Sequence, residues 1–215
     1  GGEIAVTESG EALQSPVVTI SGRALDFTAA DDGINVSSGS DSTDADAGMA
    51  GGDQAANGLL LTISGGTVVV NAGGDGLDSN GSAVITGGTV VVNGPTDNGN
   101  GALDVNGDFT ISGGTLVAAG SSGMAVAPAG SGDQAVILAT FGSALPAGTV
   151  VQVLDPDGAV MATFTTAKQV QSLAFSSAAL VSGAQYTVVT GGVAADGDIG
   201  GLATGFASTG STVVA

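Results

Sequence analysis

Carboxylates and side-chain amides recur in glycine-rich turns of this chain, and such residues could bind a hard metal ion. The stretch "GGDGLDSNG" (73–81) carries Asp75, Asp78 and Asn80, and Asp104 stands in the next turn of the same kind. Calcium binds about six to eight oxygen atoms from carboxylates, amides, carbonyls and water, whereas magnesium demands stricter octahedral order. Zinc and copper lack their usual ligands, because the chain has no His and no Cys. The predicted calcium ligands are Asp31, Asp32, Asn35, Asp75, Asp78, Asn80, Asp97, Asn98, Asn100 and Asp104.

Positive charge that could neutralise these carboxylates is almost absent. The chain has 20 Asp and Glu but only two basic residues, Arg23 and Lys168. Two carboxylates about 5 Å apart repel by roughly 0.8 kcal/mol in water and by about 3 kcal/mol at an effective dielectric near 20. If the acidic turns lie together, we therefore expect Ca²⁺ as the cofactor that joins them. The alternative is that Asp, Asn and Gly stand there only because they favour turns.

The overall composition narrows the class of protein. A net charge of −18 makes nucleic acid and anionic membrane surfaces poor partners. A hydrophobic content of 43% is too high for a disordered acidic tail. No apolar run is long enough to cross a bilayer, and the lack of cysteine excludes a disulfide framework. We predict an extracellular or cell-surface bacterial protein, and the start on Gly1 instead of Met suggests processing or a fragment.

A repeat organises the segment 1–128. Its copies are "GGEIAVTE" (1–8), "TISGRALDFT" (19–28), "TISGGTVVVN" (62–71), "VITGGTVVVN" (84–93) and "TISGGTLVAA" (110–119), and each copy precedes a polar, glycine-rich turn. The spacing of the last three copies, rich in Val, Ile, Thr and Gly, is typical of a parallel β-helix. The step between the second and third copies is nearly twice as long, and an acidic loop inserted at 37–58 explains it better than a hidden coil. The sequence predicts an all-β fold with about five coils over 1–128.

Strand alternation assigns the faces of these coils. Two columns should point inward, namely Ile4, Leu25, Val68, Val90 and Leu116, and Val6, Phe27, Val70, Val92 and Ala118. The column between them holds Ala5, Asp26, Val69, Val91 and Val117, and Asp26 requires that it face outward. Its three valines would form an apolar stripe that another element should cover. Asn71 and Asn93 should stack at the strand end, either as an amide ladder or as turn residues.

The pattern changes after Pro128. Short strands that follow one another closely predict an antiparallel β-element over 129–192, with a turn at "DPDG" (155–158). This element could cap the last coil, whose edge would otherwise be open, and cover the valine stripe. The segment 193–215 reads as a loose tail whose strand near Thr212 could be donated to a neighbouring subunit.

The central coils also resemble a known family. "TISGGTVVVNAGGDGLDSNG", "GGTVVVNGPTDNGNGALD" and "FTISGGTLVAAGSSGMA" closely resemble secreted bacterial parallel β-helix proteins that bind carbohydrate. The likeness covers roughly 17–192, including the following β-sheet region. It implies calcium and polygalacturonate binding, with Asp31, Asp32, Asp75, Asp78, Asp97 and Asp104 in the calcium turns.

Three functions fit these residues. The first is a structural surface or biofilm-matrix protein that self-assembles end to end into a filament, and this is the function that we favour. The second is a calcium-dependent binder of acidic polysaccharides such as polygalacturonate, since calcium could bridge protein and uronate carboxylates. The third and weakest is a polysaccharide lyase or hydrolase, because a lyase needs a basic residue at the substrate and Arg23 and Lys168 lie in different modules. A hydrolase needs only two carboxylates, which the turns supply.

Overall fold

The computed structural model describes residues 2–38, 55–130, 134–194, 198–210 and 212–215. Within these ranges the chain forms β-strands and turns and contains no α-helix, so the all-β prediction is confirmed. No helix long and apolar enough to cross a membrane is therefore found in this part of the chain. Most of the acidic loop predicted at 37–58 lies outside the described residues.

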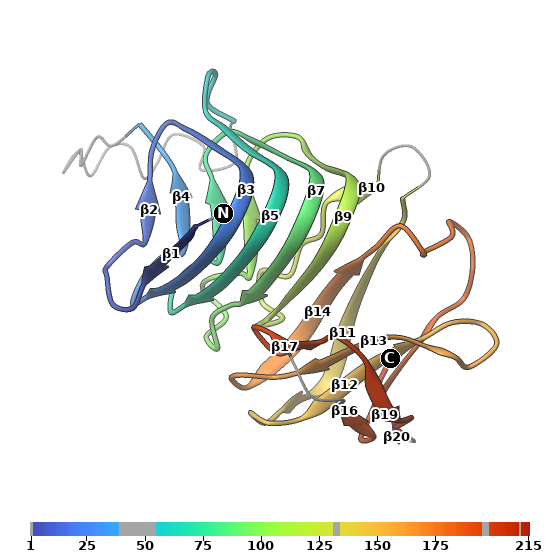
Figure 1. Ribbon diagram of the computed structural model, residues 1–215. Coiled ribbons are helices and arrows are strands. Elements are labelled where there is room, and N and C mark those ends of the chain that lie inside the picture. The colour runs from blue at the N-terminus through green and yellow to red at the C-terminus, as the bar shows by residue number, and fades with distance from the viewer. Residues whose placement is uncertain (1, 39–54, 131–133, 195–197, 211) are drawn as a thin grey trace.

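Two parallel sheets build the N-terminal part, which Figure 1 shows as a row of curved strands from blue to green. Five strands of sheet A pair in parallel with one another in chain order: β1 (Glu3–Val6), β3 (Val17–Ala29), β5 (Leu60–Ala72), β7 (Ser82–Asn93) and β9 (Phe109–Gly120). The short strands between them form parallel sheet B: β2 (Leu13–Gln14), β4 (Ile34–Val36), β6 (Leu77–Ser79) and β8 (Leu103–Val105). One repeat therefore consists of a sheet A strand, a turn and a sheet B strand.

A glycine pair lies at the bend of the sheet A strand in three repeats, where the register between strands shifts. The second glycine has a positive φ, with values of 90° at Gly66, 90° at Gly88 and 84° at Gly114. A Cβ on Gly66 would lie 2.5 Å from the carbonyl oxygen of Arg23, so this position also lacks space for a side chain. Arg23 occupies the same position in the second repeat with φ 86°, the one non-glycine residue with positive φ among those described.

The register confirms the predicted columns. Ile4 pairs with Leu25, and the same row continues through Val68, Val90 and Leu116. The second column is likewise in register, from Val6 to Ala118. Side chains of both columns form the first core, in which Val68 and Val90 are fully buried.

The C-terminal part changes the direction of sheet A. Strand β14 (Val170–Ser176) pairs antiparallel with β9, and β11 (Val136–Leu145) pairs antiparallel with β14. A short strand, β10 (Ala129–Gly130), pairs with the first half of β9. The outer edge of the last repeat is thus covered, as the sequence suggested.

A third sheet, sheet C, packs against this C-terminal part of sheet A. Sheet C contains β12 (Val150–Leu154), β13 (Val160–Thr165), β15 (Thr187–Thr190), β17 (Asp198–Ile199), β18 (Leu202–Ala203) and β20 (Thr212–Val213). Two further strands, β16 (Val193–Ala194) and β19 (Phe206–Ser208), form a separate antiparallel pair. We expected a loose tail over 193–215, but its described strands pair within the molecule, because β13 and β15 offer open edges to β18 and β20.

The valine stripe is covered as predicted. Val91 and Val117 lie in a second core with side chains of the C-terminal part, such as Phe175 and Val151. Val69 is approached by Gly200, whose Cβ, if present, would lie 2.7 Å from it. Asp26, in the same column, stays exposed.

Polar contacts also join the repeats to the C-terminal part. Asn71 and Asn93 are in register, but the Asn93 amide donates to the Gly200 carbonyl, at 3.1 Å, instead of to a stacked amide. The Lys168 ammonium donates to the carbonyl of Ala72 at the end of β5. This contact joins the C-terminal part to the end of β5. Burial lowers the pKa of Lys168 to about 8, because the ammonium loses water there.

Candidate functional site

Sheet B brings acidic turns of successive repeats together. Asn35 on β4, Asp78 on β6 and Asp104 on β8 are paired in register, so their side chains stack in one column. Adjacent strands lie about 4.8 Å apart, which sets the spacing of these groups. Asp32 and Asp75 lie in the turns just before β4 and β6. We call Asp32, Asn35, Asp75, Asp78 and Asp104, together with Glu11, the acidic column.

Two carboxylates of the column link one repeat to the next. Oδ1 of Asp32 accepts a hydrogen bond from the backbone N–H of Asp75 at 2.8 Å, and Oδ1 of Asp75 accepts one from Gly101 at 2.6 Å. Gly74 lies close beside the first link: a Cβ there would lie 2.5 Å from Oδ1 of Asp31 and 2.6 Å from Oδ1 of Asp32, so both carboxylates would have to shift. Each link uses one carboxylate oxygen, and the second oxygen of Asp32 accepts a hydrogen bond from the Asn35 amide at 3.2 Å.

Asn35 is the most buried polar group of the column, with 8% of its surface exposed. Its amide nitrogen donates to Oε1 of Glu11 at 2.8 Å and to Oδ2 of Asp32 at 3.2 Å. Its carbonyl oxygen, Oδ1, is buried without a hydrogen-bond partner. A buried amide oxygen normally has a partner, because leaving it unsatisfied costs about 1–3 kcal/mol.

The electrostatics of the column disfavour negative charge. Burial raises the pKa of Asp78 to about 7, and repulsion from Asp32, Asp75, Asp104 and Glu11 adds to the shift. Burial also raises the pKa of Asp32 to about 6, although the hydrogen bond from the Asp75 N–H opposes the rise. The pKa of Asp75 is raised by burial and partly lowered again by the Gly101 N–H. Either protons or a cation would therefore stabilise the column.

The other predicted ligands lie at its margins. Asp31 is exposed beside Gly74. Asp97, Asn98 and Asn100 lie in an exposed or half-exposed turn, where Asp97 accepts from the N–H of Gly99 at 2.9 Å and from the Asn100 amide at 3.5 Å. Asn98 accepts from the Gly123 N–H at 3.1 Å. Asn80 accepts from the Asn106 amide at 3.3 Å, beyond the end of β6.

Glu11 belongs to the column but was missed by the sequence analysis. The signal was present, since "SGEALQS" aligns with the acidic turns and its Leu13 pairs with Ile34. Only the stacking of β2 on β4 shows that a glutamate just before Leu13 reaches Asn35.

The oxygen atoms of the acidic column suit a hard cation, but the side chains do not converge on one point. All groups offer oxygen, and Oδ1 of Asn35 lacks a partner. Across the described residues, no three His, Cys, Asp or Glu side chains are arranged as metal ligands. The two links explain why, because Oδ1 of Asp32 and Oδ1 of Asp75 both point to backbone N–H groups.

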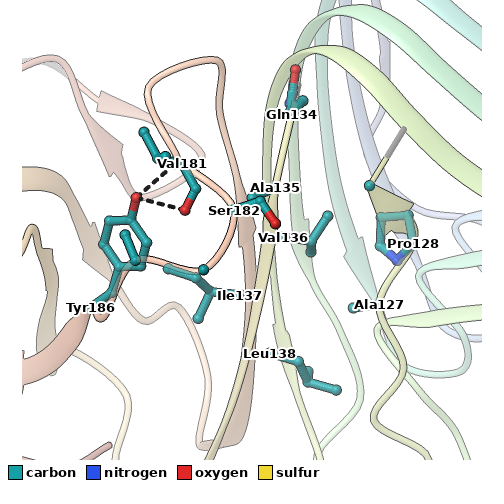
Figure 2. A pocket seen from close by; sticks show the side chains of 13 residues that line it. Ala127, Pro128, Gln134, Ala135, Val136, Ile137, Leu138, Val181, Ser182 and Tyr186 are labelled. Atoms are coloured by element: carbon teal, nitrogen blue, oxygen red, sulfur yellow. Dashed lines mark hydrogen bonds between the residues drawn. The ribbon is translucent and has the colours of Figure 1, made fainter. Parts of the chain in front are cut away.

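A different hollow, of about 400 Å³, lies beside β11. Among the described residues, its walls include Pro128, Ile137, Leu138 and Tyr186 and no charged side chain. Figure 2 shows the Tyr186 hydroxyl turned to the Val181 backbone, from whose N–H it accepts a hydrogen bond at 2.7 Å. The Tyr186 hydroxyl is thereby engaged with the backbone.

Comparison with protein-family models, with curated proteins and with solved structures finds no match to this chain.

Proposed function

We propose that this chain is a non-catalytic, extracellular parallel β-helix whose coils are joined by calcium. The observation that carries the proposal is the acidic column, in which Asp32 of one repeat and Asp75 and Asp78 of the next all have raised pKa values. The β-helix assignment is supported by the alternation of sheet A and sheet B strands in parallel register over the described residues between 3 and 120. The resemblance of the central repeats to secreted carbohydrate-binding β-helices points the same way.

Calcium would supply the positive charge that the column lacks. Asp78, Asp104 and Oδ1 of Asn35 would hold the ion, with the second oxygens of Asp32 and Asp75 nearby. The two basic side chains lie elsewhere, with Lys168 bonded to Ala72 and Arg23 against Gly2 at the bend of sheet A. Binding would offset the repulsion that raises the pKa values, and would therefore stabilise the fold as a ligand of the native state.

Thermal unfolding with excess calcium or with EGTA tests this function. We expect calcium to raise the melting temperature, magnesium to do so less, and Asp78→Asn to reduce the calcium response. Asp157→Asn is the matched control, since Asp157 is an exposed carboxylate in the 155–158 turn. Equal melting temperatures in calcium and EGTA would contradict the proposal.

Binding of acidic polysaccharide is the second candidate. The observation in its favour is that Asp32, Asp75, Asp78 and Asp104 are only half-buried, so a bound ion would keep positions open to outside oxygen ligands. Stacking of neutral sugars on aromatic rings has little support, since the chain contains no Trp and a single Tyr. Retention on immobilised polygalacturonate in calcium, abolished by EGTA and absent on a neutral glucan, would support this candidate.

A head-to-tail filament of stacked coils receives less support than the sequence suggested. Its growth needs an open strand edge at both ends of the stack. The outer edge of β9 is already paired with β14 and β10, so the open edges of the described part of sheet A are β1 and the antiparallel strand β11, which does not continue the stack of repeats. Electron microscopy of the purified protein with calcium would show filaments if another surface joins the molecules.

A further inference from the structure

Strand β11 has a free edge. It pairs with β14 on one side, and no strand of the described ranges pairs with its other side. The carbonyl of Ala135 accepts a hydrogen bond from the Ser176 hydroxyl of β14 at 2.8 Å, so the backbone groups of Ala135 face β14. Backbone groups of successive residues in an antiparallel pair point to opposite edges of the strand, so those of Val136 and Leu138 face outward. This edge therefore offers backbone donors and acceptors to a further strand.

The hollow beside β11 lies along this edge. Val136 and Leu138 both line it, and its volume of about 400 Å³ is in the range typical of ligand pockets. Figure 2 shows Val136 and Leu138 on the side of Pro128, and Ile137 on the side of Tyr186. An occupant of the hollow would thus reach both the free edge and the walls beside it.

The walls are suited to an apolar side chain. Leu138 is 42% exposed and Val181 is 63% exposed, and both line the hollow. The backbone of Val181 is bonded to the Tyr186 hydroxyl, which fixes the wall on that side. An apolar side chain that enters the hollow would remove these surfaces from water.

We propose that the β11 edge binds an extended segment of another protein, which adds to sheet A as a further strand. The backbone of the segment pairs with the outward groups of Val136 and Leu138, and an apolar side chain of the segment enters the hollow. The spacing of the backbone groups on the edge, two residues apart, matches that of another strand. A helix has no free backbone groups along its length to meet them.

The charge of the chain selects among such segments. A net charge of −18 attracts a basic segment at long range. Asp108 is exposed and stands two residues before Thr110, which pairs in parallel with Ala129. Asp108 therefore lies near Ala127, in the wall of the hollow. The expected partner segment has apolar side chains at alternate positions and basic residues at its ends.

This site goes beyond the proposed function, because no residue of the acidic column lines the hollow. The probe is a fluorescein-labelled peptide of alternating valine and threonine with a lysine at each end. We expect saturable binding to the whole chain by fluorescence anisotropy, to the same extent in calcium and in EGTA. The same peptide with methylated backbone nitrogens should not bind. With glutamate in place of lysine, the peptide should bind about tenfold more weakly at low salt.

Hydrogen exchange and a pair of variants locate the peptide. The N–H groups of Val136 and Leu138 should exchange fast in the free chain and slowly with the peptide, whereas that of Ile137, which faces β14, should exchange slowly in both. Leu138→Pro removes an outward N–H at a strand edge, where proline is tolerated, and should weaken binding about five- to tenfold. Leu138→Ala is the matched control, because it loses the same side chain but retains the N–H, and should bind more tightly than Leu138→Pro.

Circular dichroism and thermal unfolding verify that both variants fold. Absence of saturable binding, equal binding of the methylated peptide, or equal affinities of Leu138→Pro and Leu138→Ala would overturn the proposal. Slow exchange of Val136 and Leu138 in the free chain would also overturn it, because the edge would then be occupied already. Loss of the calcium response with peptide binding intact would contradict the proposed function alone.

Discussion

Oδ1 of Asp32 lies 2.8 Å from the backbone nitrogen of Asp75, which belongs to the next repeat of the stack. The same relationship recurs one repeat later, between Oδ1 of Asp75 and the nitrogen of Gly101. A carboxylate that accepts a backbone N–H is stabilised as an anion, yet burial raises the pKa of both groups. The links therefore hold the repeats in register while they concentrate negative charge.

Replacement of Asp32 separates its two roles. Asp32→Asn keeps an acceptor oxygen for the Asp75 N–H, loses the acceptor of the Asn35 amide and removes a repelled charge, so we expect a small net change in stability in EGTA. Asp32→Ala leaves that half-buried N–H without its acceptor and should cost about 1–3 kcal/mol. Urea unfolding of both variants measures the difference. Equal losses would show that the charge, and not the hydrogen bond, is what matters at this position.

The raised pKa values predict an unusual response to pH. Asp78 titrates at about 7 and Asp32 at about 6 in the folded protein, against 3.8 for an ordinary aspartate. Between about pH 4 and 7 the native state holds protons that the unfolded chain has released, so stability is greatest at the acid end and falls as pH rises through 7. In EGTA, the melting temperature should be higher at about pH 5 than at about pH 8.

The stabilisation by calcium should depend on pH in the opposite direction to the stability in EGTA. Protons compete with the ion for the same carboxylates, so the increase in melting temperature caused by calcium should be larger at about pH 8 than at about pH 5. A melting temperature that rises with pH in EGTA would contradict the raised pKa values. An increase caused by calcium that does not depend on pH would place the ion outside the acidic column.

Asp78→Asn should stabilise the protein when calcium is absent. The new amide can donate to Oδ1 of Asn35, which lacks a partner and belongs to the residue paired with position 78. A gained hydrogen bond and the loss of a repelled carboxylate should together raise the free energy of unfolding in EGTA by about 1–2 kcal/mol. The measurement is chemical denaturation in EGTA, with Asp157→Asn as the exposed control. Destabilisation by Asp78→Asn would argue that its carboxylate is needed even without a metal.

The covered valine stripe predicts a contrast within one column. Val91 is fully buried against the C-terminal part, so Val91→Ala should destabilise by about 1.5–3 kcal/mol. Asp26 occupies the same column in an earlier repeat and is exposed, so Asp26→Ala should change stability by less than about 0.5 kcal/mol. Denaturant unfolding compares the two. A similar cost at both sites would mean that the covering sheet contributes little.

Arg23→Gly should stabilise the isolated molecule. It relieves a positive φ that glycine adopts freely, which should outweigh the added freedom of the unfolded chain by about 0.5–1 kcal/mol. Chemical denaturation of both proteins measures this gain. A loss of stability would show that the packing of the Arg23 side chain against Gly2 outweighs the strain of its backbone.

The columns of sheet A could be predicted from sequence because the repeat carries its own alignment. Once the Ile residues before the glycine pairs are aligned, strand alternation assigns Val68 and Val70 to the interior and Val69 to the outside. Asp26 settled the direction, since a carboxylate cannot be buried cheaply among valines. The need to cover the outward valines then followed from their apolar surface alone.

The detail of the acidic column could not be predicted in the same way. Turn residues have no strict alternation, so the sequence could not tell that Asp32 and Asp75 bond to backbone groups while Asp97 bonds within its own turn. Glu11 was missed because its repeat has a weak version of the motif. The pairing of the described tail with sheet C could not be predicted either, because strands of two or three residues are too short to show an alternation of apolar and polar side chains.

The change from parallel to antiparallel pairing at β9 and β14 has an evolutionary consequence. The carboxylate links between repeats bind backbone N–H groups, and the inward columns of sheet A contain mainly aliphatic side chains. An internal duplication of one whole unit between β3 and β9 would therefore lengthen the molecule by about 4.8 Å and leave the C-terminal junction as it is. Relatives of different length are expected to differ by complete units, each ending in the same terminal module.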